Sequence, residues 1–148
     1  MTAPRTTSAG RLTTAVRAAA EPMTRRLLVI DDEEVIRTAL ARFLRARGFD
    51  VTTAESGAAA LDAIMQEKFV GALCDIRMPG MTGLELVPKL LAVDADLAII
   101  MLTAVNDAPT ATEALGLGAM DYMMKPVELA DLAAALEVVA TAQMVRGY

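Results

Sequence analysis

The sequence predicts an α/β protein, a doubly wound parallel sheet of five strands with helices on both faces. Two observations lead to this fold class. Short apolar runs recur along the chain, and most of them stop abruptly at a polar residue, which is typical of strands buried on both faces. Segments with apolar residues at helical spacing separate these runs. Alternation of strands and helices favours parallel strands joined by crossover helices.

The first two strand–helix units occupy the first half of the predicted domain. Residues 27–30 form an apolar run that is too short for a helix, and residues 34–47 carry apolar side chains at helical spacing with arginines on the other face. Residues 49–53 alternate and contain β-branched residues, which favours a strand. Ser56 is expected to cap a helix over residues 56–67.

The third unit contains a turn and a proline within its helix. Residues 70–74 are a second fully apolar run. Residues 78–80, Met-Pro-Gly, predict a turn because proline and glycine both interrupt regular structure. A helix is expected over residues 83–91, and Pro88 should bend or shorten it because proline removes a backbone donor.

The last two units complete the predicted sheet. An apolar run predicts a strand over residues 97–102, followed by a helix over residues 108–115. A fifth strand is expected over residues 119–124 and a final helix over residues 128–144.

The charge distribution divides the chain into two parts. The 148 residues carry a net charge of −5, but residues 1–26 hold five arginines against one glutamate, and the rest holds nine basic and 18 acidic residues. We expect a flexible tail over residues 1–24 and one domain over residues 25–145, with no output domain within the chain. The acidic body argues against direct nucleic-acid binding. No apolar run approaches the roughly 18 to 20 residues that cross a membrane.

Cysteine, histidine and methionine usage narrows the chemistry. Cys74 is the only cysteine, which fits a cytoplasmic protein, and we expect a buried structural thiol. The chain has no histidine, so histidine-based triads and a histidine phosphoacceptor are excluded. Four methionines are expected to fill the apolar core: Met101, Met120, Met123 and Met124.

Polar residues follow four of the predicted strands. Asp31 and Asp32 follow the first strand, Asp75 the third, Thr103 the fourth and Lys125 the fifth. In a doubly wound sheet these ends share one edge. Carboxylates this close repel one another unless a cation joins them, and Mg²⁺ prefers such oxygen ligands. The pattern predicts a site where a carboxylate attacks a phosphoryl group.

These residues, with their neighbours, resemble the receiver domain of response regulators. The resemblance covers about residues 26–143 and implies a flavodoxin-like strand order, 2-1-3-4-5. Four motifs carry it: Asp31-Asp32, the segment from Asp75 to Gly83 (DIRMPGMTG), Thr103-Ala104, and the segment from Asp121 to Pro126 (DYMMKP).

The resemblance implies a phosphoacceptor and a metal site. Asp75 is the expected phosphoacceptor. Asp32, Asp75 and the backbone carbonyl of Arg77 are the expected direct ligands of Mg²⁺, and Asp31 contributes directly or through water.

The resemblance also implies a switch. Thr103 is the expected hydroxyl that moves to bond the phosphoryl group on Asp75, and Tyr122 is the aromatic that then swings inward. Lys125 pairs with the phosphoryl group, and its bond to Pro126 is expected to be cis.

The implied function is a phosphorylation-dependent switch in a two-component system. A histidine kinase or phosphotransfer protein would supply the phosphoryl group, and the output would be a protein–protein contact. The surface of the predicted helices 108–115 and 128–144 with strand 119–124 is the expected homodimer face. No enzyme activity is expected beyond its own phosphorylation and dephosphorylation.

Two alternatives stay open. In the first, the chain is the receiver part of a larger DNA-binding or second-messenger regulator. In the second, it is an aspartyl-phosphate phosphohydrolase. Such hydrolases place the nucleophile after the first strand with an acid two residues later, and Glu33 stands two residues after Asp31.

Overall fold

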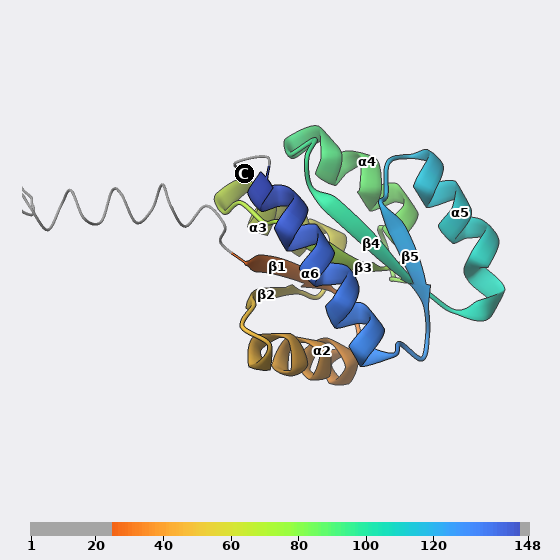
Figure 1. Ribbon diagram of the computed structural model, residues 1–148. Coiled ribbons are helices and arrows are strands. Elements are labelled where there is room, and N and C mark those ends of the chain that lie inside the picture. Colours follow the sequence, from red (N-terminus) through yellow and green to blue (C-terminus); the bar gives the residue numbers. More distant parts are fainter. Residues whose placement is uncertain (1–24, 146–148) are drawn as a thin grey trace, which may run out of the picture.

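The structure, a computed structural model, describes residues 25–145 (Figure 1). The predicted tail, residues 1–24, lies outside the described part of the chain. The strands are β1 (Arg26–Ile30), β2 (Asp50–Ala54), β3 (Gly71–Asp75), β4 (Ala98–Thr103) and β5 (Asp121–Met124). The helices are α2 (Glu34–Ala46), α3 (Gly57–Gln66), α4 (Gly83–Val93), α5 (Ala108–Gly116) and α6 (Leu129–Val145), with a short 3₁₀ helix η1 (Val105–Asp107).

The strands form one five-stranded sheet in the order β2-β1-β3-β4-β5, and every neighbouring pair is parallel. β1 and β3 lie at its centre, where Leu28 stands opposite Thr52 on one side and Ala72 on the other. The predicted fold class and strand order are confirmed. All five strands therefore end at the same edge of the sheet.

Helices cover both faces of the sheet. α2 and α6 lie on one face, and α3, α4 and α5 lie on the other (Figure 1). Alternate residues of each central strand serve the two cores: in β1, Leu27 and Val29 pack toward α2 and α6, whereas Leu28 and Ile30 pack toward α3, α4 and α5. This double burial explains why the strands are apolar throughout. Among residues 25–145, no helix is long and apolar enough to cross a bilayer.

The predicted elements are all present, and most of their ends agree to within one residue. Ser56 does cap α3, since its hydroxyl accepts a hydrogen bond from the Ala59 N–H at 3.1 Å. The fifth strand is shorter than predicted, because only residues 121–124 pair with β4.

The expected shortening of the helix at Pro88 is wrong. α4 continues to Val93, two residues past the predicted end. Pro88 lies on the exposed face, whereas Leu86, Val87 and Leu90 are fully buried around it. Burial of this apolar face offsets the missing backbone hydrogen bond.

The methionine prediction is wrong in part. Met101 is fully buried, but Met120 and Met124 are 48% and 40% exposed. β5 is an edge strand and pairs only with β4, so fewer elements cover its side chains. Cys74 is buried as predicted, and that burial raises the pKa of its thiol.

Candidate functional site

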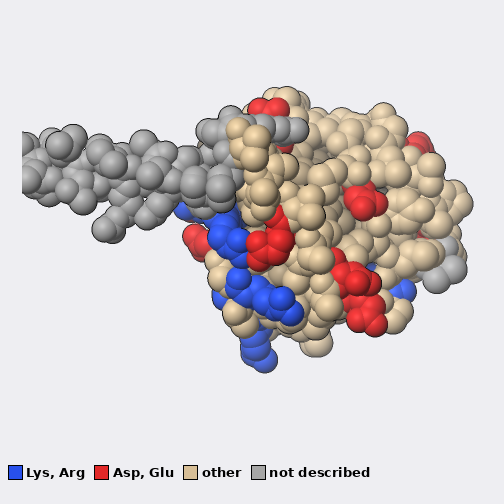
Figure 2. Space-filling view, viewed as in Figure 1, with Lys and Arg blue, Asp and Glu red and all other residues tan. Residues whose placement is uncertain are grey.

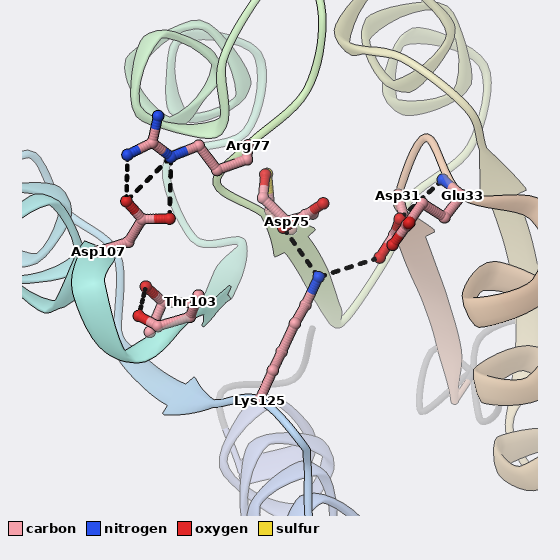
Figure 3. Close-up of polar contacts among 9 residues, drawn as sticks. Asp31, Glu33, Asp75, Arg77, Thr103, Asp107 and Lys125 are labelled. Atoms are coloured by element: carbon pink, nitrogen blue, oxygen red, sulfur yellow. Dashed lines mark hydrogen bonds and ion pairs between the residues drawn. The ribbon is translucent and has the colours of Figure 1, made fainter.

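Four strand ends place the candidate site. Asp31 directly follows β1, Asp75 is the last residue of β3, Thr103 is the last residue of β4, and Lys125 directly follows β5. Because these strands are parallel and adjacent, the four residues lie at one edge of the sheet (Figure 3). The structure thus brings Asp31, Asp75 and Lys125 into contact and places Thr103 at the same edge.

Lys125 reaches between two buried carboxylates. Its Nζ donates a hydrogen bond to Asp75 Oδ1 at 3.1 Å and lies 3.7 Å from Asp31 Oδ2 (Figure 3). Asp75 is 5% exposed and Asp31 is fully buried. One ammonium group therefore faces two negative charges that are removed from water, and the cluster keeps an excess of negative charge.

Asp31 carries an oxygen without a hydrogen bond. Its Oδ1 accepts the Glu33 N–H at 2.9 Å, and its backbone carbonyl accepts Arg37 Nη1 at 2.8 Å. Its Oδ2 is the one buried side-chain nitrogen or oxygen atom in the described residues that has no hydrogen-bond partner. A buried carboxylate oxygen is costly when unsatisfied, so this atom is suited to a cation.

The acidic residues at this edge could hold a metal ion. Asp31, Asp32 and Asp75 each offer an oxygen, and these oxygens all lie within 4.8 Å of one another. Asp31 and Asp75 are buried, whereas Asp32 is exposed. Oxygen ligands of this kind, with one open side for water, suit a small hard divalent cation.

Burial controls the ionisation of the cluster. It raises the pKa of Asp31, although the Glu33 N–H and the charge of Lys125 oppose the rise. Burial likewise raises the pKa of Asp75 against the hydrogen bond and charge of Lys125. For Lys125, burial acts to lower the pKa, but the hydrogen bond to Asp75 and the charges of Asp75, Asp31 and Glu33 outweigh it and raise the pKa.

The sequence also predicts Thr103 and Tyr122 as switch residues and a cis bond before Pro126. Thr103 is buried, and its hydroxyl donates to the carbonyl of Ala104 at 3.0 Å. Tyr122 is half-buried and packs against the core beneath α3, α4 and α5. The peptide bond between Lys125 and Pro126 is cis, which confirms that prediction.

A second ion pair, which the sequence analysis missed, lies beside the cluster. Arg77 Nε donates to both oxygens of Asp107 at 2.9 Å, and Arg77 Nη2 also donates to Asp107 Oδ1 (Figure 3). The hydrogen bonds and charge of Arg77 lower the pKa of Asp107. An aspartate just before a predicted helix is an ordinary capping candidate, so the local pattern contained no signal for this contact.

A cavity joins the cluster to the Arg77–Asp107 pair. Its volume is about 250 Å³. Seven residues line it: Asp32, Glu33, Asp75, Arg77, Ala104, Asp107 and Lys125. The site is therefore an open, strongly charged pocket with four carboxylates and two cations in its walls.

Comparison with known proteins places the chain in a family. The family model described as the response regulator receiver domain matches residues 27–137. The transcriptional regulatory protein FixJ of Azorhizobium caulinodans is 43% identical over 108 residues, which is 73% of this chain and 51% of that protein. The transcriptional regulatory protein ZraR of Escherichia coli K12 is 37% identical over 111 residues, 75% of this chain and 25% of that protein.

Solved structures of the same family superpose on this chain. A response regulator receiver domain protein (CheY-like) from Methanospirillum hungatei JF-1 superposes with a TM-score of 0.77 at 30% identity, covering 82% of this chain and 97% of that one. This chain belongs to the response regulator receiver domain family. It spans about a quarter of ZraR and about half of FixJ.

Proposed function

We propose that this chain is a phosphorylation-dependent switch of a two-component system and that Asp75 accepts the phosphoryl group. One observation supports this most strongly: Asp75 ends the central strand β3 inside a charged pocket, bonded to Lys125 and next to two further aspartates. A carboxylate in this setting can act as a nucleophile if nearby cations balance the negative charge of the incoming group.

The proposed transfer breaks one bond and makes one. An Asp75 oxygen attacks phosphorus, and the bond from phosphorus to the donor atom breaks. That donor atom is nitrogen in a phosphohistidine and oxygen in acetyl phosphate, and it keeps the bonding electron pair. Lys125, already 3.1 Å from Asp75 Oδ1, is placed to neutralise charge on the phosphoryl oxygens.

Mg²⁺ is the proposed cofactor. Asp31, Asp32, Asp75 and the backbone carbonyl of Arg77 would hold it, and the Asp31 Oδ2, which has no hydrogen-bond partner, supports such a cation. When bound, Mg²⁺ supplies positive charge that offsets the carboxylates and the phosphoryl oxygens. Asp75 then provides the attacking oxygen, and Lys125 helps to orient the phosphoryl group of the donor.

Thr103 and Tyr122 are the proposed switch. In this structure the Thr103 hydroxyl is bonded to Ala104, so it must rotate or shift to reach a phosphoryl group. Its movement would leave room for the half-buried Tyr122 ring and would change the surface of α5, β5 and α6. Couplings of this kind are worth about 1–3 kcal/mol, or about 5- to 150-fold in partner affinity.

The donor is proposed to be a histidine kinase or a histidine phosphotransfer protein, since this chain has no histidine. Apolar contact area for it lies beside Lys125. A cavity of about 530 Å³ there is lined by apolar residues of α2 and of the β5–α6 segment. Val35 and Leu129 at its rim are 82% and 41% exposed.

The output is proposed to be a protein contact, either within a larger regulator or between chains. FixJ and ZraR are transcriptional regulatory proteins by name, and both are longer than the matched region.

A homodimer through α5, β5 and α6 is proposed because Leu117, Met120 and Met124 expose 40–48% of their surface there. Sedimentation with Mg²⁺ and beryllofluoride should show a dimer that Met120→Lys weakens; an unchanged monomer would contradict this interface.

Intact mass spectrometry tests the phosphoacceptor. After incubation with Mg²⁺ and acetyl phosphate, the wild type should gain one phosphoryl group and Asp75→Asn none. Asp62→Asn, at an exposed position in α3, is the matched control and should behave as wild type. Chelation of Mg²⁺ should prevent the gain. Equal labelling of Asp75→Asn, or rapid turnover of a phosphomonoester, would favour a different chemistry.

A further inference from the structure

Asp107 occupies a helix-capping position but does not cap its helix. It immediately precedes α5, and among the described residues its side chain makes no capping hydrogen bond. An aspartate at this position ordinarily accepts the N–H of the second or third helical residue. The second residue here is Pro109, which has no N–H. The N–H of Thr110 is therefore the group that Asp107 would cap.

Arg77 holds the Asp107 carboxylate instead. Its Nε lies 2.9 Å from both carboxylate oxygens, and Nη2 donates to Oδ1 as well. The Asp107 side chain is only 3% exposed, whereas that of Arg77 is 73% exposed. The carboxylate is thus enclosed by the protein, whereas the Arg77 side chain lies on the solvent side.

The pair borders the cavity that contains Asp75. Arg77 and Asp107 form one wall of it, with Asp75 and Lys125 close by (Figure 3). Lys125 is already shared between Asp75 and Asp31. Arg77 is the second cation in the lining, and guanidinium binds phosphate oxygens in the same two-pronged geometry that it uses with carboxylate.

We propose that Asp107 is a positioning residue for Arg77 and that phosphorylation makes Arg77 change partners. Without a phosphoryl group, Asp107 holds Arg77 at the wall of the cavity. With one, Arg77 bonds the phosphoryl oxygens, and Asp107, whose backbone now has φ −103° and ψ 7°, moves toward the extended conformation of an N-cap and accepts the Thr110 N–H. This inference rests on the proposed role of Asp75. It would connect the phosphoryl group to the start of α5 by a route other than Thr103.

The affinity for beryllofluoride, a phosphoryl mimic that binds a carboxylate oxygen, tests the exchange. Calorimetry in the presence of Mg²⁺ should show that Asp107→Asn binds it about 2- to 5-fold more tightly than wild type, because Arg77 is released. Arg77→Gln should bind it more weakly. In the Arg77→Gln background, Asp107→Asn should have no further effect, since the two residues act through one interaction.

Glu33→Gln is the matched control. It removes another carboxylate from the same cavity, but Glu33 has no hydrogen bond to Arg77 among the described contacts. Its effect on affinity should be the same with Arg77 or Gln at position 77. If the effect of Asp107→Asn is also the same with Arg77 or Gln at position 77, the proposed exchange of partners is wrong. The substitution then acts only by removing a negative charge from the cavity.

Hydrogen exchange supplies a test that needs no substitution at Asp107. The Thr110 N–H should become more protected when the wild type binds beryllofluoride, and this gain should disappear in Arg77→Gln. Unchanged protection in the wild type would overturn the capping step. Failure of the wild type to bind beryllofluoride at all would overturn the proposed phosphoacceptor and the exchange with it, whereas binding without coupling would overturn the exchange alone.

Discussion

Lys125 cannot balance the charge of the aspartate cluster alone. It bonds Asp75 at 3.1 Å but lies 3.7 Å from Asp31 Oδ2, beyond hydrogen-bond distance. Burial raises the pKa of both carboxylates, so the ionised cluster opposes folding when no metal is bound. The same feature favours binding of a divalent cation. The buried carboxylates thus lower the stability of the metal-free fold and at the same time create a binding site for a cation.

The raised pKa values fix the sign of a pH dependence. A carboxyl group whose pKa is higher in the folded state binds its proton more tightly there, so folding gains stability on acidification. For Asp31 and Asp75 this gain is complete below the unfolded value of about 3.9 and is lost as pH rises through the raised folded values. The lowered pKa of Asp107 contributes in the opposite direction.

Asp31→Asn should isolate this contribution. Asparagine keeps an oxygen that can accept the Glu33 N–H but removes the buried charge. At neutral pH without metal, we expect the variant to be about 0.5–2 kcal/mol more stable than wild type in urea denaturation. The difference should shrink as pH falls. It should also reverse with Mg²⁺, because at 100 times its dissociation constant a ligand adds about 2.7 kcal/mol only to a protein that binds it.

Lower stability of metal-free Asp31→Asn at neutral pH would contradict this view of the site. Equal stabilisation of both proteins by Mg²⁺ would likewise show that Asp31 takes no part in binding the ion.

The sequence located some site residues and missed others for a physical reason. Asp31, Asp75, Thr103 and Lys125 sit at strand ends, and a parallel sheet brings strand ends together whatever the loops do. The contact of Arg77 with Asp107 depends on how two loops fold against each other. No periodic pattern encodes that, and the two residues are 30 positions apart.

α4 begins in close contact with the end of β3. The Gly83 N–H donates to the carbonyl of Ile76 at 2.9 Å, and a Cβ at Gly83 would collide with the backbone carbonyl of Asp75. Thr82 and Glu85 cap the same end reciprocally, in a capping box. Glycine at position 83 therefore lets the helix start directly against the strand that carries the proposed phosphoacceptor.

Gly83→Ala should disturb both stability and the site. Because the clash is with backbone atoms, the chain must shift, and we expect a loss of about 1–3 kcal/mol in urea denaturation. Beryllofluoride affinity should fall as well. Gly116→Ala is the control, since a Cβ there meets nothing within 4 Å, and it should leave stability unchanged or raise it by up to about 1 kcal/mol. Equal effects of the two substitutions would show that the close approach is not required.

Element types were more predictable than their ends and surroundings. Each strand and helix follows from its hydrophobic spacing, but Pro88 did not end α4, because the buried face around it continues. The exposure of Met120 and Met124 depends on β5 being the edge strand. Strand order is a property of the whole sheet, and residues 119–124 do not reveal it by themselves.

The whole domain separates a stable core from a charged edge. Two apolar clusters fill the two faces of the sheet, whereas the carboxylates gather where the strands end. The visible face in Figure 2 is mainly uncharged, with basic side chains beside acidic ones at one side and further acidic groups elsewhere. Such an arrangement lets the chemistry at one edge change without rebuilding the core.

Chemical trapping of the labelled residue tests the central proposal most directly. The protein is incubated with Mg²⁺ and acetyl phosphate, reduced with borohydride, which converts an aspartyl phosphate into homoserine, and sequenced by tandem mass spectrometry. Homoserine at position 75 alone is the expected result. Homoserine at position 31 or 32 in place of 75, or unmodified aspartate at all three, would contradict the proposed phosphoacceptor.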